Sequence, residues 1–151
     1  MRRRSAGVLL YRRDLELQVL LGHMGGPFWA KKDDRAWSIP KGEHGPDEEP
    51  LAVARREFEE ELGSPVPTDD LVPLGRLRVT SGKVLEAWAA EGDLDATATR
   101  SNTFSLEWPP RSGRVQEFPE IDRAAWFGLD EARNKLLKGQ RPFLDRLASA
   151  T

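Results

Sequence analysis

The chain has 151 residues, of which 38% are hydrophobic, and this is enough apolar material for one globular domain with a core. Its 23 lysines and arginines nearly balance 25 aspartates and glutamates, so the net charge of -2 offers no basic excess for gripping extended nucleic acid. The absence of cysteine excludes disulfide bonds, thiolate zinc sites and a cysteine nucleophile.

The basic start "MRRR" is followed by "AGVLLY", an apolar run too short to cross a membrane or to serve as a signal segment. We therefore expect a cytoplasmic protein without a membrane anchor. The next two Val- and Leu-rich runs, "SAGVLLYRR" and "LELQVLLGH", predict a pair of strands. A loop over residues 23–37 follows, then a short strand "WSIP" and a second loop, "KGEHGPDEEP".

Residues 47–62 have helical periodicity. An apolar stripe recurs every three or four positions, at Leu51, Ala54, Phe58 and Leu62. Asp47 is the expected N-cap, and Gly63 is the expected C-cap glycine.

Beyond this helix, residues 71–80 and 83–93 predict a strand pair around the turn "SGK". Residues 100–120 are mixed and are broken by two prolines, "IDRAAWF" predicts a last strand, and residues 129–137 and 141–148 predict two helices. Strands mixed with a few helices, without regular alternation, favour an α+β fold over a doubly wound one. We expect a single domain over residues 1–151.

Three glutamates of the helix, Glu57, Glu60 and Glu61, are three and four positions apart and therefore neighbours on one turn. Converging carboxylates with little counter-charge suit a hard divalent cation such as Mg²⁺ or Mn²⁺. The alternative is a solvated acidic face balanced by Arg55 and Arg56.

The surrounding spacing favours the site. It resembles the Nudix box, G-x5-E-x7-R-E-U-x-E-E-x-G-U, in which U is a bulky apolar residue. The matching residues are Gly42, Glu48, Arg56, Glu57, Phe58, Glu60, Glu61 and Gly63. Eight positions in register over residues 42–64 form a specific pattern. Ser64 departs from it, and we expect Val66 to supply the missing packing.

The resemblance implies the Nudix fold, a mixed β-sheet between helices in an α/β/α sandwich. It also implies that Glu57, Glu60 and Glu61 bind metal together with the backbone carbonyl of Lys41. Arg56 would orient Glu57, and Glu48 would lie at the edge of the site.

A further catalytic glutamate is expected on a later loop. Glu120, just before the last predicted strand, is similar in position to that of the dinucleoside polyphosphate hydrolase branch, as metal ligand or as base. Glu117 is the alternative, and either residue is also compatible with an ordinary surface glutamate.

The family resemblance implies Mg²⁺- or Mn²⁺-dependent cleavage of a phosphoanhydride in a nucleoside diphosphate-linked molecule, with a dinucleoside polyphosphate or a related nucleotide as the favoured substrate. A nucleoside triphosphate pyrophosphohydrolase, a nucleotide-sugar hydrolase and a capped-RNA hydrolase are alternatives within the enzyme class. A nucleotide-binding sensor without catalysis is the alternative outside it, disfavoured because all the box glutamates are present. The expected partner is a small nucleotide or other diphosphate, bound by a monomer or a homodimer.

The segment "WSIPKGE" resembles the "W-x-x-P-K-G" stretch of the diadenosine polyphosphate and diphosphoinositol phosphate hydrolase branches, and Lys41 there would also contact phosphate with its ammonium group. Trp29 or its neighbour Phe28 is a candidate for stacking a base, or else pins the loop to the body. Lys31, Lys32 and Lys83 are candidates for binding phosphate. The stretch 101–116 is expected to form a structural flap.

Overall fold

The computed structural model describes residues 3–151 and has one seven-stranded mixed sheet and a separate two-stranded sheet. The large sheet has the order β3-β2-β1-β6-β5, with β4 also paired to β1 and β9 to β2. Strand β1 runs parallel to β6 and antiparallel to β2 and β4. The strands are β1 (Arg3–Arg13), β2 (Leu17–Met24), β3 (Trp37–Ser38), β4 (Lys41–His44), β5 (Leu71–Thr80), β6 (Lys83–Glu91), β7 (Thr103–Glu107), β8 (Val115–Pro119) and β9 (Ile121–Gly128).

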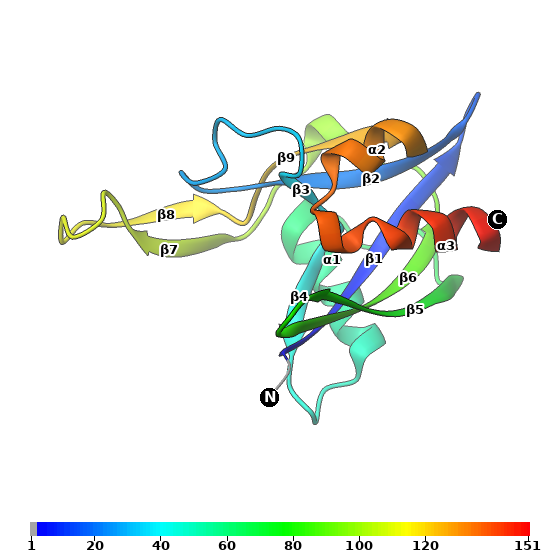
Figure 1. Ribbon diagram of the computed structural model, residues 1–151, viewed down its shortest axis with the longest axis horizontal. Coiled ribbons are helices and arrows are strands. Elements are labelled where there is room, and N and C mark those ends of the chain that lie inside the picture. Colours follow the sequence, from blue (N-terminus) through cyan, green and yellow to red (C-terminus); the bar gives the residue numbers. More distant parts are fainter. Residues whose placement is uncertain (1–2) are drawn as a thin grey trace.

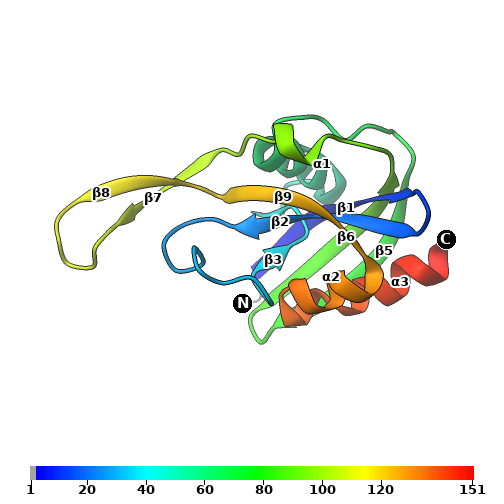
Figure 2. The same cartoon turned by 90° about the horizontal axis from the view of Figure 1, so that it is seen from above.

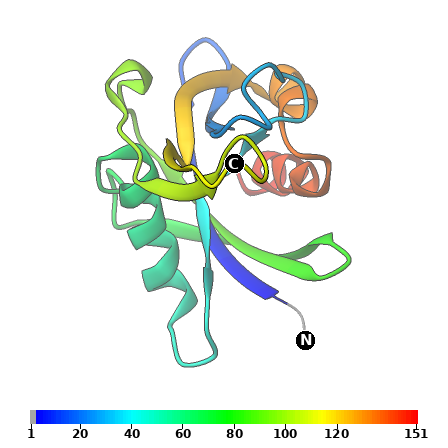
Figure 3. The same cartoon turned by 90° about the vertical axis from the view of Figure 1, so that its left-hand side faces the viewer.

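Helices cover both faces of the large sheet, α1 on one side and α2 and α3 on the other (Figure 3). The helices are α1 (Pro50–Leu62), α2 (Leu129–Lys135) and α3 (Pro142–Ala150), with short 3₁₀ turns at Ala96–Ala98 and Lys138–Gln140. A hydrophobic core lies on each face of the sheet, and strand β1 contributes to both. Val8 and Leu10 pack toward α1, while Leu9 packs toward α2 and α3. The predicted α+β sandwich is confirmed.

The N-cap of helix α1 lies two residues later than predicted. Glu49, not Asp47, is the N-cap, and its side chain accepts a hydrogen bond from the Ala52 backbone N–H. Pro50 explains the difference, because proline disfavours helical geometry in the residue before it and is well suited to the first helical position. The predicted C-cap is confirmed, since Gly63 has φ of 80° and its N–H reaches the Glu59 carbonyl.

Two segments differ from the sequence prediction. Residues 41–44, expected as loop, form strand β4, whose register pairs Gly42 with Ala6 of β1. Most of the stretch 101–116, expected as a structural flap without regular strands, belongs to a β-hairpin of β7 and β8, in which Phe104 pairs with Phe118. This hairpin, which we call the arm (103–119), extends away from the body (Figures 1 and 2). Its turn contains the two prolines that made the sequence pattern irregular.

The loop over residues 25–36, between β2 and β3, lies beside the arm (Figure 2). The rings of Phe28 and Trp108 meet edge to face with centroids 5.2 Å apart. At Gly26 a β-carbon would come 2.9 Å from the Phe104 ring. The apolar face of the arm is therefore packed against this loop rather than against the main core.

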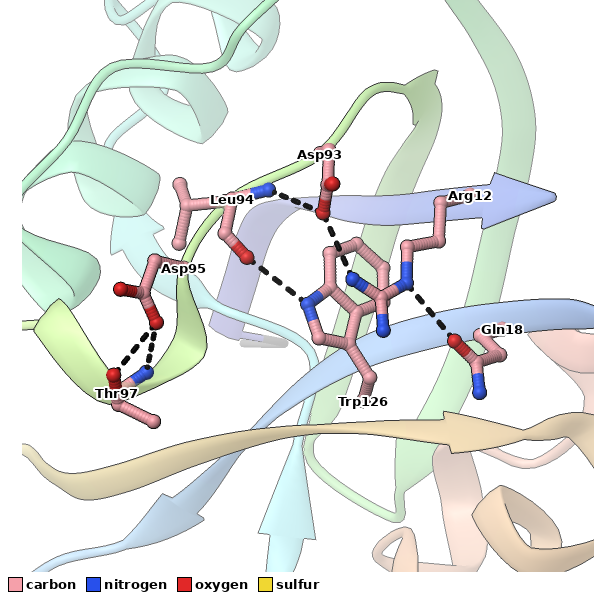
Figure 4. Close-up of polar contacts among 7 residues, drawn as sticks. All are labelled: Arg12, Gln18, Asp93, Leu94, Asp95, Thr97 and Trp126. Carbon is pink, nitrogen blue, oxygen red and sulfur yellow. Dashed lines mark hydrogen bonds and ion pairs between the residues drawn. The ribbon is translucent and has the colours of Figure 1, made fainter. Parts of the chain in front are cut away.

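A clasp of side chains ties β1, β2 and β9 to the segment after β6 (Figure 4). The Arg12 guanidinium lies 4.2 Å from the Trp126 ring centroid and donates hydrogen bonds to Gln18 and Asp93, each at 2.9 Å. The Trp126 indole N–H donates to the Leu94 carbonyl at 3.0 Å. The clasp fixes the start of the connection that leads from β6 past the end of α1 to the arm.

Within residues 3–151, no helix is both long enough and apolar enough to span a membrane.

Candidate active site

The site lies where α1 packs against β4, and Gly42 makes this close approach possible. A β-carbon at Gly42 would lie 2.1 Å from the carboxyl carbon of Glu57. The Glu57 side chain therefore occupies the space that any other residue at position 42 would fill. This contact explains why the first position of the box is occupied by glycine.

Glu61 is the most buried acidic residue of the site, with 8% of its surface exposed. Burial raises the pKa of Glu61 to about 8, and the negative charges of Glu57 and Glu120 add to this rise. Lys41 opposes it with its charge and with a hydrogen bond from its backbone N–H. These interactions bring together Lys41, two box glutamates and Glu120.

Arg56 is the cation shared by Glu48, Glu57 and Glu60. Its guanidinium nitrogens lie 3.3 Å from a Glu48 oxygen, 3.7 Å from Glu57 and 3.8 Å from Glu60. The pKa of Glu57 is nevertheless raised, first by burial and then by the charge of Glu60. The pKa of Glu48 is lowered, chiefly by the Gly45 backbone N–H that donates to its carboxylate at 2.9 Å.

Glu120 reaches this cluster from the other side, immediately before β9. Burial raises its pKa, opposed by the charge of Lys41. Its backbone N–H donates to the Asn102 carbonyl and its carbonyl accepts from Gly25, both at 2.9 Å. The alternative, Glu117, is exposed on β8 of the arm. Of these two glutamates, Glu120 is the one whose charge acts on Glu57 and Glu61.

The donor set fits a hard divalent cation. Glu61 is nearly buried and lies among the negative charges of Glu57 and Glu120, with Lys41 as its opposing charge. Oxygen-only ligands of this kind suit Mg²⁺ or Mn²⁺ rather than softer metals. In residues 3–151, however, no three Asp, Glu or His side chains already stand in a coordinating arrangement. Metal binding would therefore require some carboxylates to change rotamer. Glu60, which lies 3.8 Å from Arg56 and is partly exposed, has room to do so.

The residues predicted to bind substrate are dispersed. Trp29 packs partly against the core, with the Lys32 ammonium 5.2 Å from its ring centroid, so the loop-pinning interpretation of Trp29 is the one its contacts favour. Lys31 and Lys32 are exposed on the loop. Lys83 is exposed at the start of β6 and pairs with Arg3 of β1.

A basic cavity of about 980 Å³, which was not predicted from the sequence, opens where β4 ends. Glu43 and His44, the residues directly after Gly42, line it. The other lining residues come from three strands, the segment between β4 and α1, and the start of α1: Arg3, Arg4, Ser5, Pro46, Pro50, Arg76, Leu77, Arg78, Val84 and Glu86. The candidate substrate residues of the loop before β3, Trp29, Lys31 and Lys32, do not line it. The sequence signal was the alternation in "GRLRVT", where Arg76 and Arg78 share one face of β5 while Leu77 and Val79 pack against the core.

Two ion pairs cross this cavity's lining. Arg3 lies 3.7 Å from Glu43, and Arg76 lies 3.4 Å from Glu86. Four arginines against two glutamates leave the cavity positive, in contrast to the acidic cluster beside it. A positive cavity joined by β4 to a cluster of carboxylates is a class of site that suits an anion beside a divalent cation.

Comparison with known proteins supports this class. The NUDIX domain family model matches residues 1–147, and the chain therefore belongs to this family. The predicted class, a Nudix-type pyrophosphohydrolase, is confirmed at that level. No match was found among curated protein sequences.

Solved structures share the fold at low sequence identity. A Caenorhabditis elegans Ap4A hydrolase binary complex has a TM-score of 0.66 at 20% identity and covers 97% of this chain and 96% of its own. A NUDIX hydrolase from Nitrosomonas europaea has a TM-score of 0.65 at 19% sequence identity, and the match covers 99% of this chain and 90% of that one. The NUDIX domain of Shewanella oneidensis NrtR, complexed with ADP ribose, has a TM-score of 0.64 at 15% sequence identity, and the match covers 99% of this chain and 88% of that one.

Proposed function

We propose that this protein is a Mg²⁺- or Mn²⁺-dependent Nudix hydrolase that cleaves a phosphoanhydride bond in a nucleoside diphosphate-linked substrate, with dinucleoside polyphosphates as the first choice. The observation that supports it best is the continuity along β4. Lys41 and Gly42 contact the acidic cluster, and the next two residues, Glu43 and His44, line the basic cavity. A substrate with its diphosphate at the cluster can therefore extend its nucleoside into the cavity.

The size and lining of the cavity support a nucleotide. A volume of about 980 Å³ is at the upper end of the range for small-molecule sites. Leucine, valine and proline in the lining offer apolar contact, and the arginines offer charge-assisted hydrogen bonds to phosphate. Two similar structures, an Ap4A hydrolase and a NUDIX domain complexed with ADP ribose, are named for molecules of the proposed class.

The carboxylates of Glu57, Glu60 and Glu61, with the Lys41 carbonyl, would hold the metal. When bound, the metal neutralises diphosphate charge and makes water a better nucleophile at neutral pH. Arg56 would orient Glu48, Glu57 and Glu60 through its three contacts. The Lys41 ammonium is available to the phosphate, and Glu120, on a separate element, is our candidate for accepting the proton of the attacking water.

A substrate panel with matched variants tests this function. Dinucleoside polyphosphates, nucleotide sugars, ordinary and oxidised nucleoside triphosphates, capped RNA and diphosphoinositols are assayed with Mg²⁺ and with Mn²⁺. We expect Glu61→Gln and Glu60→Gln to lose at least about 100-fold in kcat on the best substrate. Glu59→Gln is the matched control, because Glu59 is exposed on the same helix outside the cluster.

The outcomes separate the alternatives. If Glu61→Gln hydrolyses the best substrate at the wild-type rate, the assignment of the active site is wrong. Turnover restricted to nucleoside triphosphates or to nucleotide sugars would replace the proposed substrate and keep the class. Binding of these ligands without turnover of any would favour the sensor.

A further inference from the structure

Residues 100–102 lie between the end of α1 and the start of β9. The Arg100 N–H donates to the Leu62 carbonyl at 3.1 Å, and the Asn102 N–H donates to the Glu60 carbonyl at 2.8 Å. These are carbonyls of the last helical turn, which have no partners within the helix. The segment therefore caps the part of α1 that carries the box glutamates.

The same segment holds Glu120 through its other groups. The Asn102 carbonyl accepts the Glu120 N–H at 2.9 Å, and on the far side the Glu120 carbonyl accepts the Gly25 N–H at 2.9 Å. A β-carbon at Gly25 would lie 1.8 Å from the Pro119 carbonyl oxygen, so the two backbones are in tight contact. The peptide groups on both sides of the Glu120 α-carbon are thus fixed.

Ser101 adds a side-chain contact to this backbone ladder. Its hydroxyl donates to the Asn102 carbonyl at 2.8 Å and accepts the Ile121 N–H at 3.0 Å. Ile121 is buried, so its N–H has little access to water as a substitute acceptor. One hydroxyl therefore joins the cap of the box helix to the residue after Glu120.

We propose that Ser101 is a positioning residue for Glu120, keeping its carboxylate in reach of the box glutamates on α1. This proposal rests on the proposed function, because it assigns Glu120 to the reacting site. The need for such a device follows from the arm. Glu120 directly follows a projecting two-stranded ribbon, and isolated ribbons of this kind are only marginally stable. Without the ladder, motion of the arm would pass directly to Glu120, and catalytic groups tolerate displacements of only about 0.5 Å.

The test compares Ser101→Ala with wild type, with Ser105→Ala as the matched control. Ser105 is an exposed serine of β7 on the same arm, away from the ladder. We expect Ser101→Ala to lower kcat by about 10- to 100-fold, the range for a displaced catalytic group, while KM stays within about twofold. Amide hydrogen exchange at Ile121 and Glu120 should accelerate. Ser101→Thr, which keeps the hydroxyl, should restore both readouts, and Ser105→Ala should change neither.

A double-mutant cycle decides whether Ser101 acts through Glu120. If it does, Ser101→Ala combined with Glu120→Gln is no slower than Glu120→Gln alone. Effects that multiply would overturn the proposal, as would wild-type kcat in Ser101→Ala when Glu61→Gln is inactive. An active Glu61→Gln variant would instead overturn the proposed function. If Ser101→Ala does not fold, Ser101→Cys, with a similar volume and a weaker acceptor, replaces it in the cycle.

Discussion

The side chain of Glu57 fills the space beside Gly42, so that a β-carbon on Gly42 would lie 2.1 Å from the Glu57 carboxyl carbon and 2.4 Å from one of its oxygens. The atoms in conflict belong to the end of a flexible side chain and not to the backbone. A larger residue at position 42 therefore has an easy way to fit, which is to push the carboxylate aside. The fold can accept this change, but the site cannot.

We expect Gly42→Ala to lower kcat by about 10-fold or more while the melting temperature changes little, because Glu57 moves and the helix does not. Steady-state kinetics and thermal unfolding on the same preparation check this. Gly45→Ala is the control, since a β-carbon there meets its nearest neighbour, a Glu48 oxygen, at an ordinary 3.8 Å. A variant with full activity would show that the position of Glu57 does not matter for turnover.

For Gly63 we expect a different outcome, because a β-carbon added there would collide with backbone atoms and not with the end of a side chain. It has φ of 80°, and a β-carbon would lie 2.8 Å from the Arg100 carbonyl oxygen. We expect Gly63→Ala to reduce the free energy of unfolding by about 1–3 kcal/mol, measured by urea denaturation. Gly82→Ala, in the turn between β5 and β6 with open space around the added carbon, should cost much less. Equal losses would mean that the contact with Arg100 relaxes freely.

The elevated pKa of Glu61 predicts a pH dependence of stability. Between the ordinary value of 4.5 and about 8, the unfolded chain has released the Glu61 proton while the folded chain retains it. The free energy of unfolding therefore falls as pH rises through this window, and the full cost of ionising the buried carboxylate is present above it. Glu61→Gln should remove this part of the slope and be more stable than wild type at pH 8.

Urea titrations at several pH values in EDTA measure this effect, with Glu59→Gln as the control that keeps the wild-type slope. Addition of Mg²⁺ at pH 8 should stabilise wild type and leave Glu61→Gln much less affected, because the ion binds the ionised carboxylates. If wild type and Glu61→Gln have parallel pH profiles, Glu61 does not keep its proton at neutral pH.

The sequence was most informative where function follows helical spacing. Glu57, Glu60 and Glu61 could be placed together because one turn of helix separates them, and Phe58 was correctly expected in the core. Glu120 was a candidate because of its place before the last predicted strand and its resemblance to the dinucleoside polyphosphate hydrolase branch. The Asn102 and Gly25 hydrogen bonds that hold it come from distant segments, and no local pattern in the sequence indicates them.

The basic cavity could not be read from local patterns for the same physical reason. Arg3 and Arg4 lie in β1, Arg76 and Arg78 in β5, and their meeting depends on β6, which lies between these strands. The loop with Phe28 and Trp29 offered a more obvious combination of aromatic and basic residues. In the structure, this loop packs on the core and on the arm.

The cationic side chains that bind substrate differ according to whether the substrate lies in the basic cavity or on the loop between β2 and β3. Arg78 is exposed on the face of β5 that lines the cavity, and a charge-assisted hydrogen bond to phosphate contributes roughly 1.5–3 kcal/mol. We expect Arg78→Gln to raise KM by about 10-fold or more while kcat changes little, as for lost uniform binding. Arg13→Gln, at the opposite end of β1 from the cavity, is the control for loss of one exposed charge.

Lys31→Gln tests the competing site, because Lys31 is exposed on the loop between β2 and β3. A raised KM in Lys31→Gln together with an unchanged KM in Arg78→Gln would move the substrate from the cavity to the loop.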